Sequence, residues 1–476
     1  MNERNDTEGT EETYDLAILG AGPGGYTAAI RAGQLGAKVL LIEGEHLGGT
    51  CLNWGCIPTK ALYRTAEVLE DAREGEAFGL NIESAAADFP ATMQRKDSVV
   101  EGLRSGIDQL LESNGVEILR GWGRLSETGE LTVQAPGGDE VAVAAERILL
   151  ATGSVPSRPR IPGLDLPGVV DSRDMLALEE CPKRLVVIGG GIIGMEFASI
   201  FSALGAEVTV LEMLPQLLPT VDDEIARRMG PMFRKKGITA HTKATVKAVE
   251  ESSDGLVVHY ERRDKEETVA ADLVLVATGR APNTRDLPLD ALGIEHERGA
   301  IRVDDAMVTT NPRFLAIGDA VARMMLAHVA SAEGLVAVEN AFGSGRDPVN
   351  YRAVPSAVFT LPPAASVGLS EAAAKEEYDE VGVAKFPFAA LGKAVAQGAV
   401  DGLVKLVYDE ETRQLLGLHV LGAGAPELVH EGAIAIQHRL GVDALAHTVH
   451  AHPTLSEAVM EAAHVAVGAP IHIVGR

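Results

Sequence analysis

Residues 14–25 read YDLAILGAGPGG, and this stretch decides the expected fold. Its apolar half predicts a short buried strand, and a helical pattern follows the glycines. A second apolar run, KVLLIE, occupies residues 38–43. The spacing G-x-G-x-x-G is carried by Gly20, Gly22 and Gly25. A strand, a helix and a second strand in this order form a βαβ unit, whose glycine turn lets a diphosphate approach the helix N-terminus.

The same βαβ motif with a glycine turn occurs a second time in the sequence. Residues 185–194 read LVVIGGGIIG, and the motif glycines are Gly189, Gly191 and Gly194. An acidic residue ends the next strand in each copy, Glu43 in the first and Glu212 in the second, 23 residues after the first glycine. Two complete copies favour two dinucleotide sites over two glycine turns that bind nothing. A carboxylate at Glu212 accepts from a free ribose hydroxyl and repels a 2′-phosphate, so NAD is favoured over NADP.

Three further apolar runs are expected to be strands. Residues 148–150 and 273–276 each lead into Ala-Thr-Gly, and each is expected to close one dinucleotide-binding domain. The run 314–317 leads into Gly318 and Asp319. Two functions stay open for Asp319: it contacts a flavin ribityl chain, or it caps the helix that follows.

Residues 48–60 read GGTCLNWGCIPTK and place Cys51 and Cys56 five residues apart. Because helical side chains at i and i+5 point to different sides, a disulfide between them requires a distorted helix start, which Gly55 and Pro58 are expected to supply. A helix N-terminus favours thiolate over thiol, so the pair indicates redox chemistry. The alternatives are two structural thiols, or two ligands of a metal site completed elsewhere; we expect no metal, because no His and Cys cluster has zinc-like spacing.

Residues 450–457 read HAHPTLSE near the C-terminus. Pro453 restricts the residue before it, and a helix is expected to begin near Glu457, so an imidazole and a carboxylate can be fixed against each other. A carboxylate that accepts one ring proton makes the other ring nitrogen a better base. The residues alone do not choose between His450 and His452, and a purely structural histidine is the alternative.

Composition limits the function classes. The chain has 476 residues, 42 basic against 68 acidic side chains, and a formal net charge of -26. This excess argues against a nucleic-acid partner, and it fits either a saline cytoplasm or an ordinary acidic enzyme. No apolar run is long enough for a membrane span and residues 1–13 are no secretory signal, so we expect a cytoplasmic protein with a disordered acidic tail at 1–13. The third cysteine, Cys181, is expected to be inert.

Together these motifs resemble the pyridine nucleotide-disulfide oxidoreductases, and most nearly the members that oxidise dihydrolipoyl groups. The resemblance runs from about Tyr14 to the end of the chain. It implies an α/β homodimer with two Rossmann-like dinucleotide-binding domains and a C-terminal α+β dimerisation domain. The implied parts are the tail (1–13), an FAD-binding domain (14–155), an NAD-binding domain (156–281), a central domain completing the FAD site (282–352) and an interface domain (353–476).

The resemblance also implies roles for single residues. Cys51 exchanges with substrate and Cys56 contacts the flavin, while Lys60 and Glu196 form a charge pair near the flavin. His452 is the base and comes from the partner chain, and Glu457 orients it. The residues expected at FAD are Gly20, Gly22, Gly25, Glu43, Gly49, Thr50, Lys60, Thr152, Gly153, Gly318, Asp319, Met325, Ala327 and His328. Those expected at NAD are Gly189, Gly191, Gly194, Glu212 and Gly279.

The implied reaction oxidises lipoyl groups carried by proteins of 2-oxoacid dehydrogenase or glycine cleavage complexes, with NAD as acceptor. The nearest alternative is an NAD(P)H-dependent reductase of another small disulfide. A non-catalytic subunit that keeps the dinucleotide sites is the second alternative.

Overall fold

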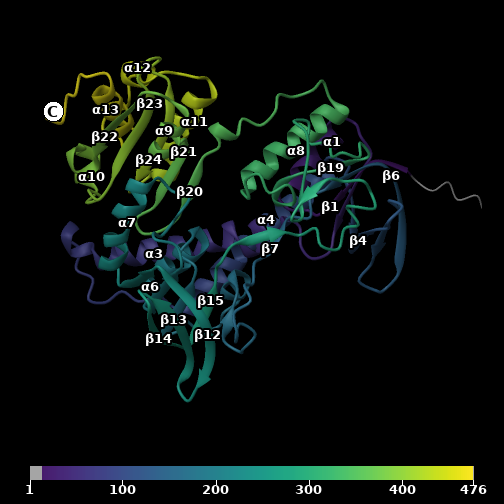
Figure 1. Ribbon diagram of the computed structural model, residues 1–476, viewed down its shortest axis with the longest axis horizontal. Helices are drawn as coiled ribbons and strands as arrows, with labels where there is room; N and C mark the ends of the chain where they lie inside the picture. The colour runs from purple at the N-terminus through teal and green to yellow at the C-terminus, as the bar shows by residue number, and fades with distance from the viewer. Residues whose placement is uncertain (1–12, 475–476) are drawn as a thin grey trace, which may run out of the picture. The chain divides into compact units, whose positions relative to one another are not determined.

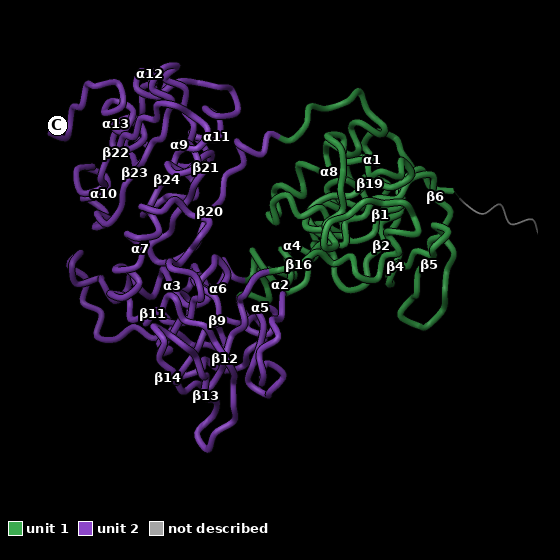
Figure 2. Tube along the Cα trace, viewed as in Figure 1, with its two compact units in different colours: residues 1–58, 96–156, 280–349 green, residues 59–95, 157–279, 350–476 purple. Residues whose placement is uncertain are grey.

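The computed structural model describes residues 13–474, which fall into two compact units (Figure 2). Unit 1 comprises residues up to 58 together with 96–156 and 280–349, and unit 2 comprises 59–95, 157–279 and 350–476. Of the expected acidic tail, residues 1–12 lie outside the described residues, and Thr13 already belongs to the first strand. The units group residues by contact, so the four-domain division given above stays a prediction.

Unit 1 is built on a parallel sheet in the order β3-β2-β1-β6, with β19 beside β6. Its strands are β1 (Thr13–Leu19), β2 (Val39–Glu43), β3 (Glu117–Arg120), β4 (Trp122–Leu125), β5 (Leu131–Gln134), β6 (Glu140–Leu150), β7 (Ser154–Pro156), β16 (Arg280–Pro282), β17 (His296–Glu297), β18 (Ala300–Ile301) and β19 (Phe314–Ala316). Its helices are α1 (Pro23–Gln34), α2 (Gly49–Trp54), the 3₁₀ turn η2 (Gly318–Ala320) and α8 (Ala327–Phe342).

Helices α1 and α8 pack closely because glycines line their contact. A Cβ on Gly24 would lie 3.0 Å from the Ala330 carbonyl oxygen, and one on Gly334 would lie 2.8 Å from the Gly24 oxygen. Side chains at these positions would push the helices apart. The close packing therefore fixes the helix that follows the first glycine turn.

Unit 2 holds a second parallel sheet in the order β11-β10-β9-β15-β8 and a C-terminal antiparallel sheet in the order β20-β21-β24-β23-β22 (Figure 1). Its strands are β8 (Val169–Val170), β9 (Arg184–Ile188), β10 (Glu207–Glu212), β11 (Ile238–Thr242), β12 (Ala244–Ser252), β13 (Gly255–Arg262), β14 (Lys265–Ala271), β15 (Leu273–Val276), β20 (Ser356–Val358), β21 (Ala364–Gly368), β22 (Val381–Pro387), β23 (Leu403–Asp409) and β24 (Leu415–Leu421). Its helices are α5 (Ser172–Met175), α6 (Ile192–Leu204), α7 (Asp223–Lys235), α9 (Glu371–Glu377), α10 (Gly392–Ala396), α11 (Ala425–Gln437), α12 (Val442–His447) and α13 (Glu457–Ala466).

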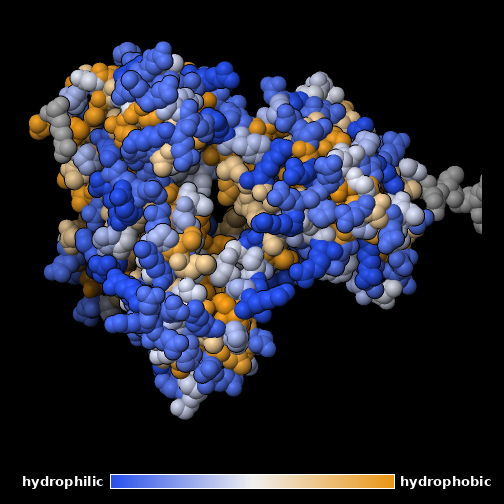
Figure 3. Space-filling model, viewed as in Figure 1, coloured by the Kyte–Doolittle hydropathy of each residue, from blue (hydrophilic) through white to orange (hydrophobic). Residues whose placement is uncertain are grey.

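Two long helices, α3 (Cys56–Arg73) and α4 (Phe89–Ser113), contain residues of both units. The short 3₁₀ turns are η1 (Gly75–Phe78), η3 (Tyr351–Ala353) and η4 (Phe388–Ala390). No described helix is both long and apolar enough to cross a membrane. The face drawn in Figure 3 is mostly hydrophilic, as the acidic composition leads one to expect.

Both predicted βαβ units are confirmed. In unit 1, β1 lies between its parallel neighbours β2 and β6, and in unit 2, β9 lies between β10 and β15. The strands expected before the two Ala-Thr-Gly turns are β15 and the end of β6, and each lies beside the first strand of its motif. The mixed α/β class with a C-terminal α+β part is therefore the observed fold.

Candidate active site

The glycines of the first turn have two different roles, one steric and one in ligand binding. A Cβ on Gly20 would lie 2.4 Å from the Ala151 carbonyl oxygen, and one on Gly25 would lie 1.9 Å from the Gly20 oxygen. Both positions thus exclude any side chain. A Cβ on Gly22, in contrast, has no atom within 4 Å. The middle glycine faces open space at the N-terminus of α1, where the backbone can bind a diphosphate.

The second glycine turn repeats this geometry in unit 2. A Cβ on Gly189 would lie 2.4 Å from the Ala277 oxygen, and one on Gly194 would lie 2.0 Å from the Gly189 oxygen. Gly191 again faces open space, at the N-terminus of α6. Gly279, which follows β15, has a left-handed φ of +117° and is also open to a ligand. The two turns are therefore built alike, one in each unit.

The acid at the end of each second strand has a contact that the sequence did not predict. Glu43 Oε2 accepts a hydrogen bond from the Ala21 N–H at 2.8 Å, and Glu212 Oε2 accepts one from the Gly190 N–H at 2.6 Å. Glu212 is buried, and its Oε1 accepts from the Leu214 N–H at 2.7 Å. Each carboxylate thus holds its glycine turn, and the remaining lone pairs are available for the predicted ribose contact.

The residues expected around the flavin lie in unit 1, apart from Lys60. Thr152 Oγ1 is buried and has no hydrogen-bond partner, which marks a polar atom that a ligand can satisfy. Gly49 has φ +54°, and a Cβ there would lie 2.6 Å from the Gly22 Cα. The same unit contains Thr50, Gly153, Gly318, Met325, Ala327 and His328. The open Gly22 and the unpartnered Thr152 hydroxyl fit a bound dinucleotide.

One of the two alternatives for Asp319 is wrong. The residue lies inside η2, where its carboxylate accepts a hydrogen bond from the Ser154 hydroxyl. The next helix, α8, has Leu326 at its N-cap position and no side-chain capping bond. Asp319 therefore does not cap α8, and the contact with a flavin remains the prediction for it.

The two cysteines lie on either side of a helix break. Cys51 lies within α2 and Cys56 is the first residue of α3, and both are half-buried. The break comes at Gly55, whose backbone leaves the helical region with φ -146° and ψ -113°. Pro58 lies four residues after Trp54, the last residue of α2, and has no N–H to donate to the Trp54 carbonyl, so it adds to the break as expected. Cys56 thus meets the condition for a helix-stabilised thiolate.

Lys60 lies one turn after Cys56 on α3 and contacts Glu196 of α6. Its Nζ is 3.0 Å and 2.9 Å from the two carboxylate oxygens. The Glu196 side chain is only 6% exposed and also accepts from the Phe359 N–H at 3.0 Å. The ammonium lies over the Phe359 ring, 4.5 Å from its centre. The implied charge pair is therefore formed, and its position relative to a flavin stays a prediction.

His452 and Glu457 form a hydrogen-bonded pair in unit 2. His452 Nδ1 lies 2.8 Å from Glu457 Oε1, and the other carboxylate oxygen accepts from the Thr454 N–H at 2.8 Å. The imidazole is 79% exposed, so its Nε2 can meet a substrate. Burial opposes ionisation of Glu457, but the Thr454 N–H, His452 and a charge on His450 outweigh it and lower the pKa of this carboxyl. The peptide bond between His452 and Pro453 is cis, which the sequence did not predict.

His450 has a different environment. Its Nε2 lies 2.9 Å from Glu431 Oε2 of α11, and its Nδ1 lies 2.8 Å from the Thr448 carbonyl oxygen. The side chain is only 7% exposed. Sequence reasoning missed Glu431, because no motif connects it with His450. Since both ring nitrogens are engaged, His450 has none left to accept a proton from a substrate.

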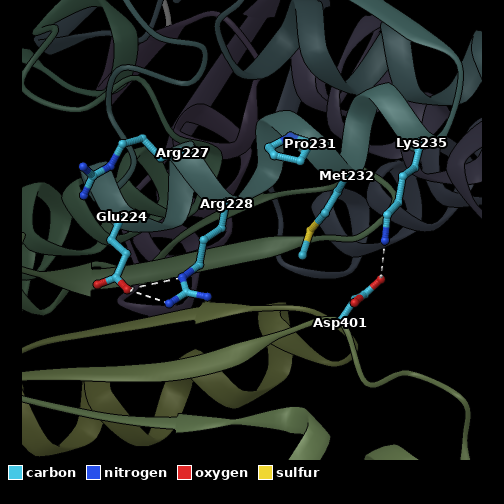
Figure 4. Close-up of a pocket in the computed structure, with 7 residues that line it drawn as sticks. All are labelled: Glu224, Arg227, Arg228, Pro231, Met232, Lys235 and Asp401. Carbon is cyan, nitrogen blue, oxygen red and sulfur yellow. Dashed lines mark hydrogen bonds and ion pairs between the residues drawn. The ribbon is translucent and has the colours of Figure 1, made fainter.

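One surface hollow of about 490 Å³ lies along α7 (Figure 4). It is lined by Glu224, Arg227, Arg228, Pro231, Met232, Lys235 and Asp401. Its charged groups pair with one another, as in the contacts of Arg228 with Glu224 and of Lys235 with Asp401. None of the predicted site residues lines it. Residues 13–474 also hold no group of three His, Cys, Asp or Glu side chains arranged for a metal ion.

Comparison with known proteins agrees with this geometry. The family model described as pyridine nucleotide-disulphide oxidoreductase matches residues 14–334. The chain belongs to this family. The family's dimerisation domain matches residues 354–463. Membership makes the chain an oxidoreductase, with FAD and NAD as cofactors of its dinucleotide-binding domains.

Several family members are similar over nearly their full length. A dihydrolipoyl dehydrogenase of Chlamydia trachomatis is 42% identical over 97% of this chain and 98% of its own length. One from Bacillus subtilis is 40% identical over 96% of this chain and 99% of its own. Among solved structures, LpdA of Mycobacterium tuberculosis has a TM-score of 0.87 at 28% identity, covering 94% of this chain and 98% of its own. The HOCl-induced flavoprotein disulfide reductase RclA of Escherichia coli has a TM-score of 0.84 at 31% identity, with coverages of 94% and 99%.

Proposed function

We propose that this oxidoreductase oxidises dihydrolipoyl groups to lipoyl groups, with NAD as the final acceptor. The observation that supports this most directly is the His452 and Glu457 pair, an exposed imidazole oriented by a carboxylate, in a chain that also has the Cys51 and Cys56 pair. The similarity to dihydrolipoyl dehydrogenases over nearly the full length supports the same substrate class.

The proposed mechanism starts from an oxidised enzyme in which a disulfide joins Cys51 and Cys56. His452 Nε2 takes the proton of one substrate thiol. The resulting thiolate attacks Cys51 Sγ, which breaks the bond between Cys51 and Cys56 and releases Cys56 as a thiolate. The second substrate thiol then attacks the substrate sulfur bound to Cys51. The lipoyl disulfide forms, Cys51 leaves, and the second thiol proton moves to the Cys51 sulfur. Two electrons have then passed from the dithiol to the cysteine pair.

The cofactors would be held by the two glycine turns. Gly20, Gly22 and Gly25 with Glu43 would bind FAD, and Gly189, Gly191 and Gly194 with Glu212 would bind NAD. When bound, FAD supplies the hydride chemistry between the cysteine pair and NAD. Cys56 is the first residue of α3, so the positive end of the helix dipole stabilises its thiolate. The Lys60 and Glu196 pair is proposed to set the charge near the flavin.

The partners are proposed as well. The dimerisation domain supports a homodimer, in which we infer that His452 of one chain serves the cysteine pair of the other. The lipoyl group would arrive on a protein of a 2-oxoacid dehydrogenase or glycine cleavage complex. The cytoplasm is the proposed compartment, because three cysteines fit a catalytic pair better than a disulfide framework.

The deciding experiment measures NADH formation by the purified yellow protein with dihydrolipoamide and NAD, beside NADPH oxidation with glutathione disulfide. We expect fast NADH formation and no NADPH activity, because the buried Glu212 repels a 2′-phosphate. The opposite result would overturn the proposal in favour of an NADPH-dependent reductase. Bound flavin without turnover in either assay would indicate a non-catalytic protein.

A further inference from the structure

His450 is held so that both of its ring nitrogens face acceptors. The Thr448 carbonyl oxygen, 2.8 Å from Nδ1, can only accept a hydrogen bond. Glu431 Oε2, 2.9 Å from Nε2, accepts when ionised. A neutral imidazole has a single N–H and can satisfy only one of these two acceptors. The ring satisfies both as the doubly protonated imidazolium.

The charges around His450 come from three elements. Glu431 of α11 contacts the ring directly, Glu457 of α13 interacts with it through space, and His452 lies in the same loop. Burial works against a charge on His450, but the hydrogen bonds to Glu431 and to the Thr448 carbonyl, together with both carboxylates, raise its pKa. Glu431 and Glu457 thus favour the charged form of the His450 imidazole.

This charge acts on the proposed base through Glu457. The same carboxylate accepts from His452 Nδ1 and is stabilised as an anion by the charge on His450. A fixed positive charge beside a carboxylate and imidazole pair disfavours the uptake of a further proton by that pair. Glu457 therefore stays a pure acceptor, which holds the His452 ring with its proton on Nδ1 and leaves Nε2 to meet the substrate.

We propose that His450 is a positioning residue for the proposed reaction: an imidazolium clamped by Glu431 and Thr448, whose charge keeps Glu457 an ionised acceptor for the proton on His452 Nδ1. This inference rests on the proposed function, because it needs His452 to act as the base. It assigns different roles to His450 and His452, the two histidines that the sequence alone could not distinguish.

The test compares the pH dependence of kcat/KM for dihydrolipoamide oxidation in the holoenzyme and three variants. His450→Gln removes the charge, His450→Lys keeps it, and His447→Gln removes a nearby exposed histidine as a matched control. We expect His450→Gln to move the acid limb of the profile upward, because without the charge Glu457 takes up a proton at a higher pH. His450→Lys should bring the limb back toward its parent position, and His447→Gln should leave it unchanged.

A lower rate in His450→Gln with an unmoved acid limb would overturn the proposal, because it would show that His450 only supports the loop. A second measurement does not depend on turnover: NMR of the holoenzyme labelled at histidine, with the His450 signal identified by its loss in His450→Gln. We expect an imidazolium signal that persists above pH 6.5, the usual pKa of a histidine side chain. A neutral His450 at that pH would overturn the proposal even if the oxidation of dihydrolipoamide is confirmed, and absent turnover would refute the proposed function alone.

Discussion

Cys51 and Cys56 carry the redox proposal at the scale of single residues. Replacing either with Ser should lower dihydrolipoamide oxidation by more than about a thousandfold, because the exchange needs both sulfurs. Flavin absorbance should stay, since neither side chain is needed for the glycine turn. Steady-state NADH formation and the visible spectrum measure the two effects.

Cys181→Ser is the control for this pair. Burial raises the pKa of the Cys181 thiol, so it is a poor nucleophile at neutral pH, and the variant should keep parental activity. Near-normal turnover in Cys51→Ser or Cys56→Ser would contradict the mechanism.

The sequence predicted those site residues whose partners are close in the chain. The glycine turns are local, so spacing rules were sufficient to find them. Pro453 and the expected helix start predicted a paired imidazole and carboxylate, but only the family resemblance chose His452 over His450. The contact of His450 with Glu431 joins a loop to another helix, and the contact of Lys60 with Glu196 spans 136 positions. No pattern of residue types carries the first contact, and only the family resemblance gave the second.

At the scale of elements, the two βαβ units offer a matched pair of variants. Gly22→Ala and Gly191→Ala each add a Cβ into open space, so neither should disturb folding. Each should instead obstruct the diphosphate of its own ligand. We expect Gly22→Ala to lose most of its bound flavin. Gly191→Ala should keep its flavin and raise the KM for NAD by at least about tenfold.

Flavin content per chain, the KM for NAD and circular dichroism distinguish these outcomes. Gly25→Ala serves as the steric control, because its Cβ would lie 1.9 Å from the Gly20 oxygen and should disrupt the turn itself. Equal effects of Gly22→Ala and Gly191→Ala on flavin content would show that the two turns do not bind separate ligands.

The N-terminus of α7 is attached to the C-terminal sheet by a buried ion pair. Asp222 caps α7, and Lys405 of β23 lies 3.0 Å from both of its carboxylate oxygens with a side chain only 1% exposed. Lys405→Met should lower the free energy of unfolding by about 3–5 kcal/mol, because it leaves a buried carboxylate without its cation. Urea unfolding measures this loss.

Lys385→Met is the surface counterpart. This lysine pairs with Glu224 at 2.6 Å but is 41% exposed, so its loss should cost less than about 1 kcal/mol. A similar small cost for Lys405→Met would mean that water or a rearranged neighbour compensates the buried Asp222.

The acid dependence of stability follows from another carboxylate of this network. Hydrogen bonds from Lys375 and Lys405 lower the pKa of Glu371 from 4.5 to about 2, against the opposing effect of burial. Between these values the unfolded chain binds the proton and the folded chain does not, so the stabilisation by Glu371 is complete above pH 4.5 and is lost as the pH falls toward 2. Glu371→Gln should therefore flatten the decline of unfolding free energy in this range, as measured by urea midpoints.

Glu376→Gln provides the comparison, because this exposed acid lies on the same helix, α9. Its acid profile should match the parent. If Glu371→Gln also keeps the parental slope, Glu371 does not contribute to acid stability.

Most elements were predictable because their signals are periodic and local. The strands β1 and β9 coincide with the apolar stretches before the two glycine turns, and β10 ends at Glu212 as expected, since buried parallel strands read as apolar runs between turns. The break between α2 and α3 was expected from Gly55 and Pro58, and it comes at Gly55.

At the scale of the whole molecule, the proposed dimer predicts complementation between two inactive variants. Cys51→Ser and His452→Gln should each be inactive alone. If His452 serves the partner chain, a mixed dimer has one site with intact cysteines and an intact base. With random exchange, half of the dimers are mixed and half of their sites work, so about a quarter of parental activity should return.

The exchange is started by partial unfolding and dilution of an equimolar mixture, and NADH formation is measured afterwards. Mixing Cys51→Ser with Cys56→Ser is the control, because both changes affect the same part of the site and no intact site can form. No recovery in the first mixture, with mixed dimers demonstrated by mass spectrometry, would show that the base and the cysteines act within one chain.

The unpartnered hydroxyl of Thr152 has a consequence for the stability of the protein in a cell. Without its cofactor the chain retains a buried polar atom that nothing satisfies, together with the open space beside Gly22. A ligand that binds only the folded state stabilises it by mass action, so the newly made chain is least stable before it binds flavin. Proteases remove unfolded chains continuously, so the supply of flavin would set the amount of this enzyme as well as its activity.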